Sequence, residues 1–245
     1  MIKKVIIIGA KSDIAKTAAL QFAKNGFDLL LVGRDVNSEL NEFGQSISEE
    51  SGRKVSLYDL NILDKDATDL FLNTIKNIPD GIISFVGLLG NQQKAIKDPN
   101  YAETIFKSNF NAIVPIIDFF ANQFEDRKDG FIIGISSVAG VRVKKRNYYY
   151  GSAKAAFTAY LSGLRNRLDK SNVHIMTVLP GYVETKMTRE MELPKWSTVS
   201  PEYVGRKIVN AYKNKKDVIY VPSIWKIIMS IIRFIPERIF KKLDI

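Results

Sequence analysis

The residues of this chain that most suggest chemistry are Tyr150 and Lys154, four positions apart, with Ser137 upstream. If the segment 148–170 is helical, the phenol and the ammonium lie on adjacent turns of one helix face. A nearby cation favours the ionised phenol, so such a tyrosine can serve as an acid or a base near neutral pH. It could protonate a carbonyl oxygen while a hydride reaches the carbon, with Ser137 holding the same oxygen. A surface Tyr–Lys pair would show the same spacing.

Ser137 closes the apolar run 131–135, so a buried strand must position it, and a loop must then return the chain to a helix near residue 148. Similar apolar runs alternate with helical patterns along the chain. They predict strands at 3–8, 28–32, 54–58, 81–86, 131–136, 173–179 and 218–221. This alternation is typical of an α/β fold, a Rossmann-type doubly wound parallel sheet of about seven strands with helices on both faces. We expect one domain over 1–222 and a helical tail over 223–245.

The first predicted strand ends at Gly9 and leads into a helical pattern, an arrangement that presents a helix N-terminus to a phosphate group. Only one glycine stands where a dinucleotide fingerprint has three, so the motif alone is weak. We expect the carboxylate of Asp13 to cap the helix and point away from the pyrophosphate. The residues of this turn predicted to bind the cofactor are Gly9, Lys11, Ser12, Asp13 and Ile14.

The second predicted strand is followed by Gly33, Arg34 and Asp35. An acidic residue directly after this strand would select the ribose 2′-hydroxyl, whereas a glycine followed by arginine suits a 2′-phosphate. We therefore predict NADP as the cofactor, with NADPH preferred over NADH and Lys11 as a second cation. The alternative is that Arg34 is a solvated loop charge.

With these motifs in order, the chain resembles the short-chain dehydrogenase/reductase family over residues 3–221. The resemblance implies a catalytic group, a set of cofactor contacts and a segment that closes over the nicotinamide. The implied catalytic residues are Asn109, Ser137, Tyr150 and Lys154. The further implied cofactor residues are Asp59, at the adenine, Leu60, Gly87, Pro180, Gly181, Val183 and Thr185.

In this family the tyrosine is the acid or base, the lysine lowers its pKa and binds the ribose, the serine orients the carbonyl, and the asparagine supports a proton relay. Two departures from the family pattern stand out. Asp13 and Ala15 replace two glycines of the turn, and the segment 84–87 replaces a usual Asn-Asn-Ala-Gly. The altered turn leaves open a nucleotide-binding sensor or scaffold that does no chemistry.

Composition narrows the function further. The chain has 245 residues, no cysteine and a formal net charge of +10. Without cysteine there are no disulfides or thiolate metal sites, and the single histidine, His174, is expected to be structural, so no metal site is predicted. The basic residues are scattered without a nucleic-acid motif, so we expect no nucleic-acid partner. The densest internal cluster, 144–146, predicts either a solvated loop or an electropositive rim for a phosphorylated substrate.

The tail carries Lys226, Ser230 and Arg233 as one polar stripe on an otherwise apolar helix, too short to span a bilayer. It predicts a peripheral contact with an anionic membrane, or burial against the same chain or another subunit of a homo-oligomer. The start of the chain lacks a signal-peptide pattern, so we expect a cytoplasmic protein, peripheral on the inner face of the membrane. Segment 186–199 is expected to be a mobile lid. Its Met187, Met191, Leu193 and Trp196 could contact a lipid chain or simply pack.

Within the family, the turn 9–14, the segment 85–90 and the tail 234–242 are similar to the reductase subunits of decaprenylphosphoryl-ribose epimerases. That resemblance implies reduction of a 2-keto sugar on a polyprenyl phosphate for a cell-envelope polysaccharide, after a flavin-dependent oxidase partner has made the ketone. A reductase of a plain lipid carbonyl, such as a ketoacyl, sterol or sphingoid compound, is the alternative enzyme. The sequence leaves the substrate, the direction and the stereochemistry open.

Overall fold

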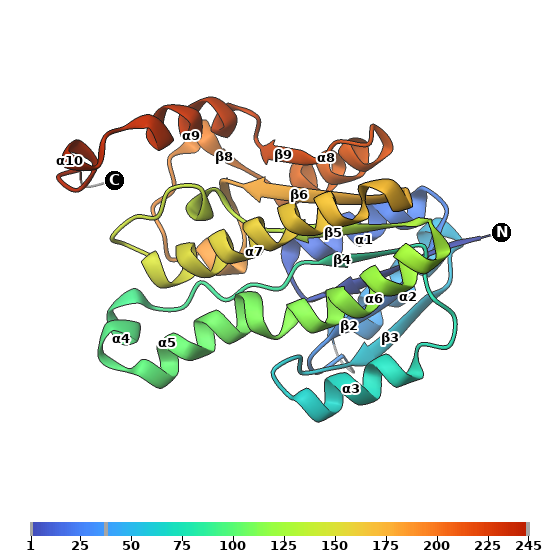
Figure 1. Cartoon of the computed structure of the whole chain (residues 1–245). Helices are drawn as coiled ribbons and strands as arrows, with labels where there is room; N and C mark the ends of the chain where they lie inside the picture. The colour runs from blue at the N-terminus through green and yellow to red at the C-terminus, as the bar shows by residue number, and fades with distance from the viewer. Residues whose placement is uncertain (1, 37–38, 244–245) are drawn as a thin grey trace.

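The computed structural model describes residues 2–36 and 39–243, which build a seven-stranded sheet in the order β3-β2-β1-β4-β5-β6-β9 (Figure 1). Every neighbouring pair is parallel. The strands are β1 (Lys3–Ile8), β2 (Phe27–Gly33), β3 (Val55–Asp59), β4 (Gly81–Ser84), β5 (Gly130–Ile135), β6 (Val173–Pro180) and β9 (Val218–Val221). The predicted Rossmann-type sheet is confirmed, and no predicted strand boundary is wrong by more than two residues.

The central strands form because their apolar runs are continuous. All eight residues of β6 and all four of β4 are buried, as a parallel strand with a helical layer on each face requires. β1 begins with two exposed lysines and continues with four buried residues, so the strand enters the core at its third residue.

The helices fill the connections between strands. They are α1 (Asp13–Lys24), α2 (Glu39–Ser51), α3 (Lys65–Thr74), α4 (Gln92–Lys97), α5 (Pro99–Phe106), α6 (Ile113–Arg127), α7 (Tyr148–Leu168), α8 (Pro201–Lys213), α9 (Ile224–Phe234) and α10 (Glu237–Phe240). Helix α7 confirms the helix predicted over 148–170, since a 3-10 turn, Asp169–Ser171, continues it.

Two helical layers cover the sheet. Residues of α1, α2 and α8 share one hydrophobic core with one face of the sheet, and residues of α3, α6 and α7 share another with the opposite face. Figure 1 shows α6 and α7 crossing in front of the strands with α1 and α2 behind them. The fold is therefore doubly wound, and both faces are closed to water.

The carboxyl ends of the strands meet at one edge of the sheet, where the strand order reverses between β1 and β4. Ligands of open α/β sheets bind at such a switch point. The same end carries a small parallel ladder of β7 (Tyr182–Val183) with β8 (Thr198–Val199), which the sequence did not predict, and is roofed by α9. Within the described part of the chain, no helix is both long and apolar enough to cross a membrane.

Candidate active site

A cavity of about 630 Å³ lies at the carboxyl ends of β1, β4, β5 and β6. Its walls come from the turn after β1, the ends of β2 and β4, the start of α7, the segment after β6 and helix α9. Most of the predicted site residues line it: Gly9, Lys11, Ser12, Asp13, Ile14, Arg34, Leu60, Gly87, Ser137, Tyr150, Lys154, Pro180, Gly181, Val183 and Thr185. Asp59 and Asn109 do not.

The turn after β1 brings the N-terminus of α1 to the cavity. Gly9 has φ of +79°, and a Cβ there would stand 3.0 Å from the backbone of Phe85, so both its conformation and its close approach require glycine. Its N–H donates to the carbonyl of Val32, which fixes the turn against β2. The first N–H groups of α1 are therefore held at the cavity, where they suit a pyrophosphate.

Asp13 does not cap α1, so that prediction is wrong. Ser12 occupies the cap position, without a side-chain cap hydrogen bond, and Asp13 is the first helical residue. The Asp13 carboxylate instead accepts a hydrogen bond from the backbone N–H of Lys186, at 2.7 Å. It therefore holds the segment that follows β7 and still lines the cavity.

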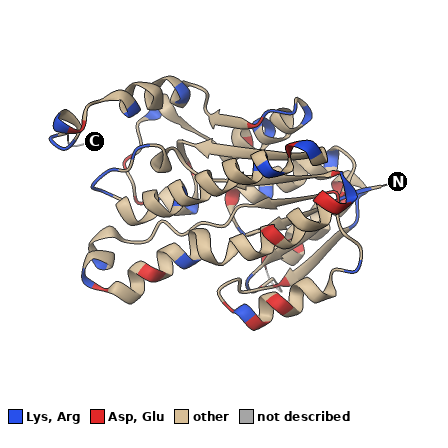
Figure 2. Cartoon of the chain, viewed as in Figure 1, with Lys and Arg blue, Asp and Glu red and all other residues tan. Residues whose placement is uncertain are grey.

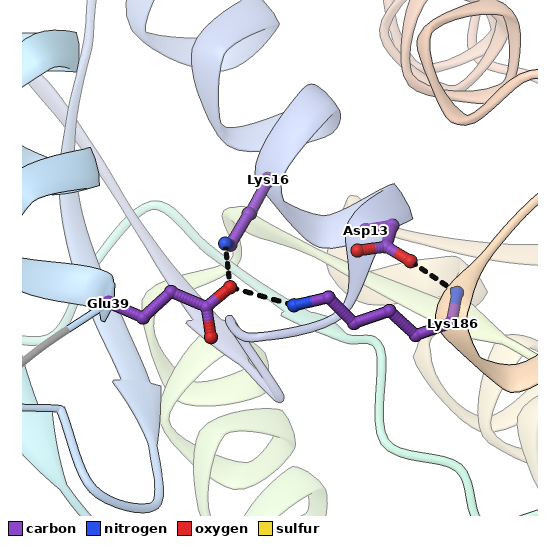
Figure 3. Close-up of polar contacts among 4 residues, drawn as sticks. All are labelled: Asp13, Lys16, Glu39 and Lys186. Carbon is purple, nitrogen blue, oxygen red and sulfur yellow. Dashed lines mark hydrogen bonds and ion pairs between the residues drawn. The ribbon is translucent and has the colours of Figure 1, made fainter.

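The Lys186 side chain extends the same contact (Figure 3). Its Nζ donates to Glu39 Oε1 at 2.8 Å, and Lys16 Nζ reaches the same oxygen at 2.5 Å. Hydrogen bonds from the two lysines hold the pKa of Glu39 at about 2, so the carboxylate stays ionised across the neutral range. Asp13, Lys16, Glu39 and Lys186 thus form a latch between segment 186–199 and the first two helices.

Weakening this latch should make segment 186–199, the predicted lid, more mobile. In Glu39→Gln we expect trypsin to cleave after Arg189 about two- to fivefold faster, because an exposed ion pair contributes about 0.2–1 kcal/mol. Limited proteolysis followed by mass spectrometry measures the rate. Glu50→Gln, which removes an ion pair with Lys24 at the other end of α2, is the matched control. Equal cleavage in both variants would show that the latch does not restrain the lid.

Asp59 contacts the protein rather than the cavity. Its two carboxylate oxygens accept from the backbone N–H groups of Asp35 and Val36, at 3.3 and 3.4 Å. The carboxylate therefore fixes the turn that carries Arg34, where Asp35 has φ of +53°. The contact of Asp59 with the adenine stays a prediction.

The predicted catalytic residues Ser137, Tyr150 and Lys154 lie together at the ends of β4 and β5. Tyr150, in the first turn of α7, lies beside Ser137, which follows β5, and the Ser137 hydroxyl lowers the pKa of its phenol. Lys154 is 2% exposed, and its Nζ donates to the carbonyls of Val86 and Ile135 at 2.9 and 3.0 Å. The predicted juxtaposition of serine, tyrosine and lysine is present in the structure.

The acid–base properties of this group differ from the prediction. Tyr150 keeps partial exposure through the cavity, yet desolvation raises its pKa to about 12, against a lowering by the Ser137 hydrogen bond. Burial lowers the pKa of Lys154 to about 7, and its Nζ is 5.9 Å from the tyrosine ring centre. Without bound ligand, the effect of burial on the pKa of Tyr150 is larger than that of the nearby Lys154, so Tyr150 is a protonated phenol at neutral pH.

Asn109 lies behind the cavity wall, 1% exposed, in a π-helical turn, Lys107–Asn111. Its side chain accepts from the N–H of Leu88 and donates to the carbonyl of Leu88 and to that of Ile105. A Cβ on Gly87 would lie 3.4 Å from Lys154 Nζ and 3.5 Å from Asn109 Oδ1, so the two side chains converge on this glycine. Asn109 therefore positions the segment after β4, and its predicted part in a proton relay stays a prediction.

Helix α9 supplies two cavity residues that the sequence did not identify, Trp225 and Met229. Trp225 packs edge-on against Tyr182, and a Cβ on Gly181 would stand 1.9 Å from its Nε1. The only sequence signal was the spacing of Trp225 and Met229 on one helix face. The prediction that the tail packs against its own chain is thus correct for this face.

Only some residues of the predicted lid, 186–199, and of the predicted basic rim, 144–146, line the cavity. Met187 and Met191 line the cavity, whereas Leu193 and Trp196 do not, and Trp196 is 72% exposed. In the cluster 144–146 only Lys144 lines the cavity, and burial followed by repulsion from Arg146 lowers its pKa.

His174 lies outside the cavity and contacts the carbonyl of Lys216 through Nε2 at 3.1 Å, as expected of a structural residue. Among the residues that the structure describes, no cluster of three or more potential metal ligands is found.

Comparison with known proteins agrees with this geometry. The family model described as short chain dehydrogenase matches residues 3–196. An uncharacterized oxidoreductase of Mycobacterium tuberculosis (strain ATCC 25618 / H37Rv) is 31% identical over 166 residues, 68% of this chain and just under two thirds, 66%, of that protein. A 7beta-hydroxysteroid dehydrogenase of Clostridium sardiniense is 26% identical over 216 residues, 87% of this chain and 78% of that protein.

Solved structures show the same fold. A short-chain dehydrogenase from Sphingobium yanoikuyae in complex with NADPH superposes with a TM-score of 0.83 at 21% identity, covering 96% of this chain and 97% of that one. The L-sorbose reductase from Gluconobacter frateurii, complexed with NADPH and L-sorbose, gives 0.79 at 19% identity over 89% and 94% of the two chains. None of these four proteins is named as an epimerase subunit, so that finer resemblance stays a prediction. The chain belongs to the short-chain dehydrogenase/reductase family, NAD(P)(H)-dependent oxidoreductases that interconvert carbonyls and alcohols.

Proposed function

We propose that this protein uses NADPH to reduce a carbonyl on a lipid-linked, phosphorylated sugar. The observation that carries the proposal is the composition of the cavity beside Tyr150. One half-buried cation, Lys144, lies there together with an apolar wall formed by Met187, Met191, Trp225 and Met229. A phosphate and a lipid chain on one substrate would use both features.

The other half of the cavity fits a dinucleotide. The start of α1 offers backbone N–H groups for a pyrophosphate. Lys11 and Arg34, both at the end of β2, would bind the 2′-phosphate of NADPH. The relatives crystallised with NADPH support this choice. When bound, the nicotinamide supplies the hydride, and Gly181, Val183 and the segment after them would hold its ring.

The protein itself supplies the proton. Burial keeps the Tyr150 phenol protonated at neutral pH, so it can donate to a carbonyl oxygen as negative charge develops there. The adjacent Ser137 side chain supplies a second hydroxyl that can contact the same carbonyl oxygen. Lys154 is held below them by two backbone carbonyls, where its Nζ can orient a ribose hydroxyl.

The chemistry of such a substrate places the enzyme second in a sequence of two steps. A 2-keto sugar arises by oxidation of the corresponding alcohol, so we propose a flavin-dependent oxidase as the preceding enzyme. Hydride delivery to the opposite face of the ketone would then give the epimeric alcohol.

A reductase of a plain lipid carbonyl is the second candidate. The apolar wall of methionines and Trp225 alone would accept a ketoacyl, sterol or sphingoid chain, since methionine adapts to irregular apolar ligands. The similarity to a 7beta-hydroxysteroid dehydrogenase supports this alternative. It assigns no role to Lys144.

Substrate phosphate separates the two. With purified full-length protein, we expect NADPH oxidation with a short-chain polyprenylphosphoryl 2-keto pentose, at a kcat/KM at least about tenfold above that for an unphosphorylated keto lipid. Lys144→Gln should remove this advantage, mainly by raising KM. Lys145→Gln, next in the chain but outside the cavity, is the matched control. Turnover of the unphosphorylated lipid at an equal or higher rate would favour the second candidate.

A further inference from the structure

Helix α9 has two apolar faces, and only one of them is used by the fold. Trp225 and Met229 point inward, 6% and 1% exposed. A second row of apolar residues, at i, i+3, i+7 and i+10, lies on the outer side: Ile224, Ile227, Ile231 and Phe234. Ile231 is 64% and Phe234 83% exposed, which is high for large apolar side chains adjacent to one another on a helix.

Cations surround this outer row. Lys226 and Arg233 lie on the polar stripe of α9, and the segment after it carries Arg238, Lys241 and Lys242. The single acidic residue among the described residues of the tail, Glu237, is paired with Arg142 at 2.6 Å. Figure 2 shows blue as the main charge colour along α9 and α10. An apolar row beside a positive stripe is complementary to a surface of anionic headgroups over acyl chains.

The tail is fixed to the body of the protein, so the outer row keeps one orientation. Trp225 Nε1 donates to the carbonyl of Ser197, and Arg142 donates to the carbonyl of Ile235 and lies over the Phe240 ring at 4.1 Å. Trp196, 72% exposed, precedes Ser197 and so lies near the start of α9. The exposed indole thus lies at the same, cavity end of the molecule as the outer row of α9, and these residues are together called the docking face.

We propose that this docking face, Trp196 with Ile224, Ile227, Ile231 and Phe234, binds the surface of an anionic lipid bilayer. The apolar row inserts at the level of the headgroups, and the cations of the tail contact the lipid phosphates. Because the inner face of α9 lines the cavity, docking places this wall of the cavity next to the membrane. A polyprenyl chain then reaches Met229 without crossing water; this last step alone rests on the function proposed above.

Vesicle co-sedimentation of the full chain tests the docking face without any sugar substrate, so its outcome does not depend on the enzyme's reaction. We expect binding to phosphatidylcholine vesicles that contain about one third phosphatidylglycerol, and at least about tenfold weaker binding to pure phosphatidylcholine. Raising the salt concentration should weaken the binding to the mixed vesicles.

Ile231→Glu with Phe234→Glu should weaken binding to the mixed vesicles at least about tenfold, because both charges fall in the inserted row. Lys241→Gln with Lys242→Gln should weaken it severalfold and reduce the preference for anionic lipid. Leu70→Glu is the matched control, since Leu70 is 63% exposed on α3, on the other side of the molecule (Figure 1). It should sediment like the wild type.

The substitutions lie outside the cavity, so a thermal melt close to that of the wild type should accompany each one; Ile227→Gln is the milder variant if the double substitution unfolds. Equal sedimentation of the wild type and the Ile231→Glu, Phe234→Glu variant would overturn the proposal. So would a wild-type dimer that this variant dissociates with no vesicle binding, because the row would then be a contact between copies of the chain.

Discussion

Replacing Tyr150 with Phe should lower kcat/KM for carbonyl reduction by about 10³-fold and leave the Kd for NADPH within about twofold of that of the wild type. The substitution removes only the hydroxyl, the group that would donate a proton to the developing alkoxide. The rest of the ring stays in the first turn of α7 beside the cavity. Steady-state kinetics and fluorescence titration of NADPH measure the two quantities.

The raised pKa of Tyr150, about 12, predicts how the rates of reduction and oxidation depend on pH. At neutral pH the phenol is protonated and suited to reduction, whereas alcohol oxidation needs the phenolate. The wild-type oxidation rate should therefore rise as the pH increases toward the pKa, and Tyr150→Phe should show neither the rate nor the rise.

Tyr149→Phe is the matched control, because Tyr149 is the adjacent phenol and does not line the cavity. It should retain activity within about twofold of wild type. If Tyr150→Phe reduced a carbonyl at more than about a tenth of the wild-type rate, another group would have to supply the proton, and the assignment would be wrong.

The sheet was predictable from sequence because its strands are buried on both faces. A strand such as β6, with eight buried residues, needs an unbroken apolar run, and such runs stand out between helical patterns. β7 and β8 were missed because two residues are too few to show a period. Their pairing depends on how the segment after β6 folds back.

The positions of Ser137, Tyr150 and Lys154 followed from local rules, a strand end and a four-residue helix spacing. The predicted cap at Asp13 was wrong because a carboxylate accepts a hydrogen bond from whichever donor the fold brings near. For Asp13 that donor is Lys186, 173 residues away along the chain. Local sequence could not identify this partner.

The pKa of Tyr150 could not be predicted for a related reason. The spacing showed that a cation would be near, but the opposing effect of burial depends on the closed packing of helices and loops around the cavity. The Trp225 side chain can likewise point into the cavity only because residue 181, opposite it, is a glycine. Both are properties of the folded chain rather than of a motif.

Arg34→Leu should lower kcat/KM with NADPH by about 10- to 100-fold and change it with NADH by less than about threefold. A charge-assisted hydrogen bond to a phosphate contributes about 1.5–3 kcal/mol, and only NADPH carries the 2′-phosphate. Arg34 lines the cavity directly after β2, in a turn that the Asp59 carboxylate holds. Kinetics with each cofactor at a fixed carbonyl substrate give the ratio.

Arg206→Leu is the control, because it removes the same charge from an exposed position on α8 outside the cavity. An equal loss with both cofactors would mean that Arg34 contacts a part that they share, such as the adenosine. No loss with either would leave Lys11 as the phosphate ligand, since its side chain packs over Gly33 beside Arg34. Because Asp35 lines the same end and would repel a phosphate, a selective loss with NADPH would show that the arginine outweighs this carboxylate.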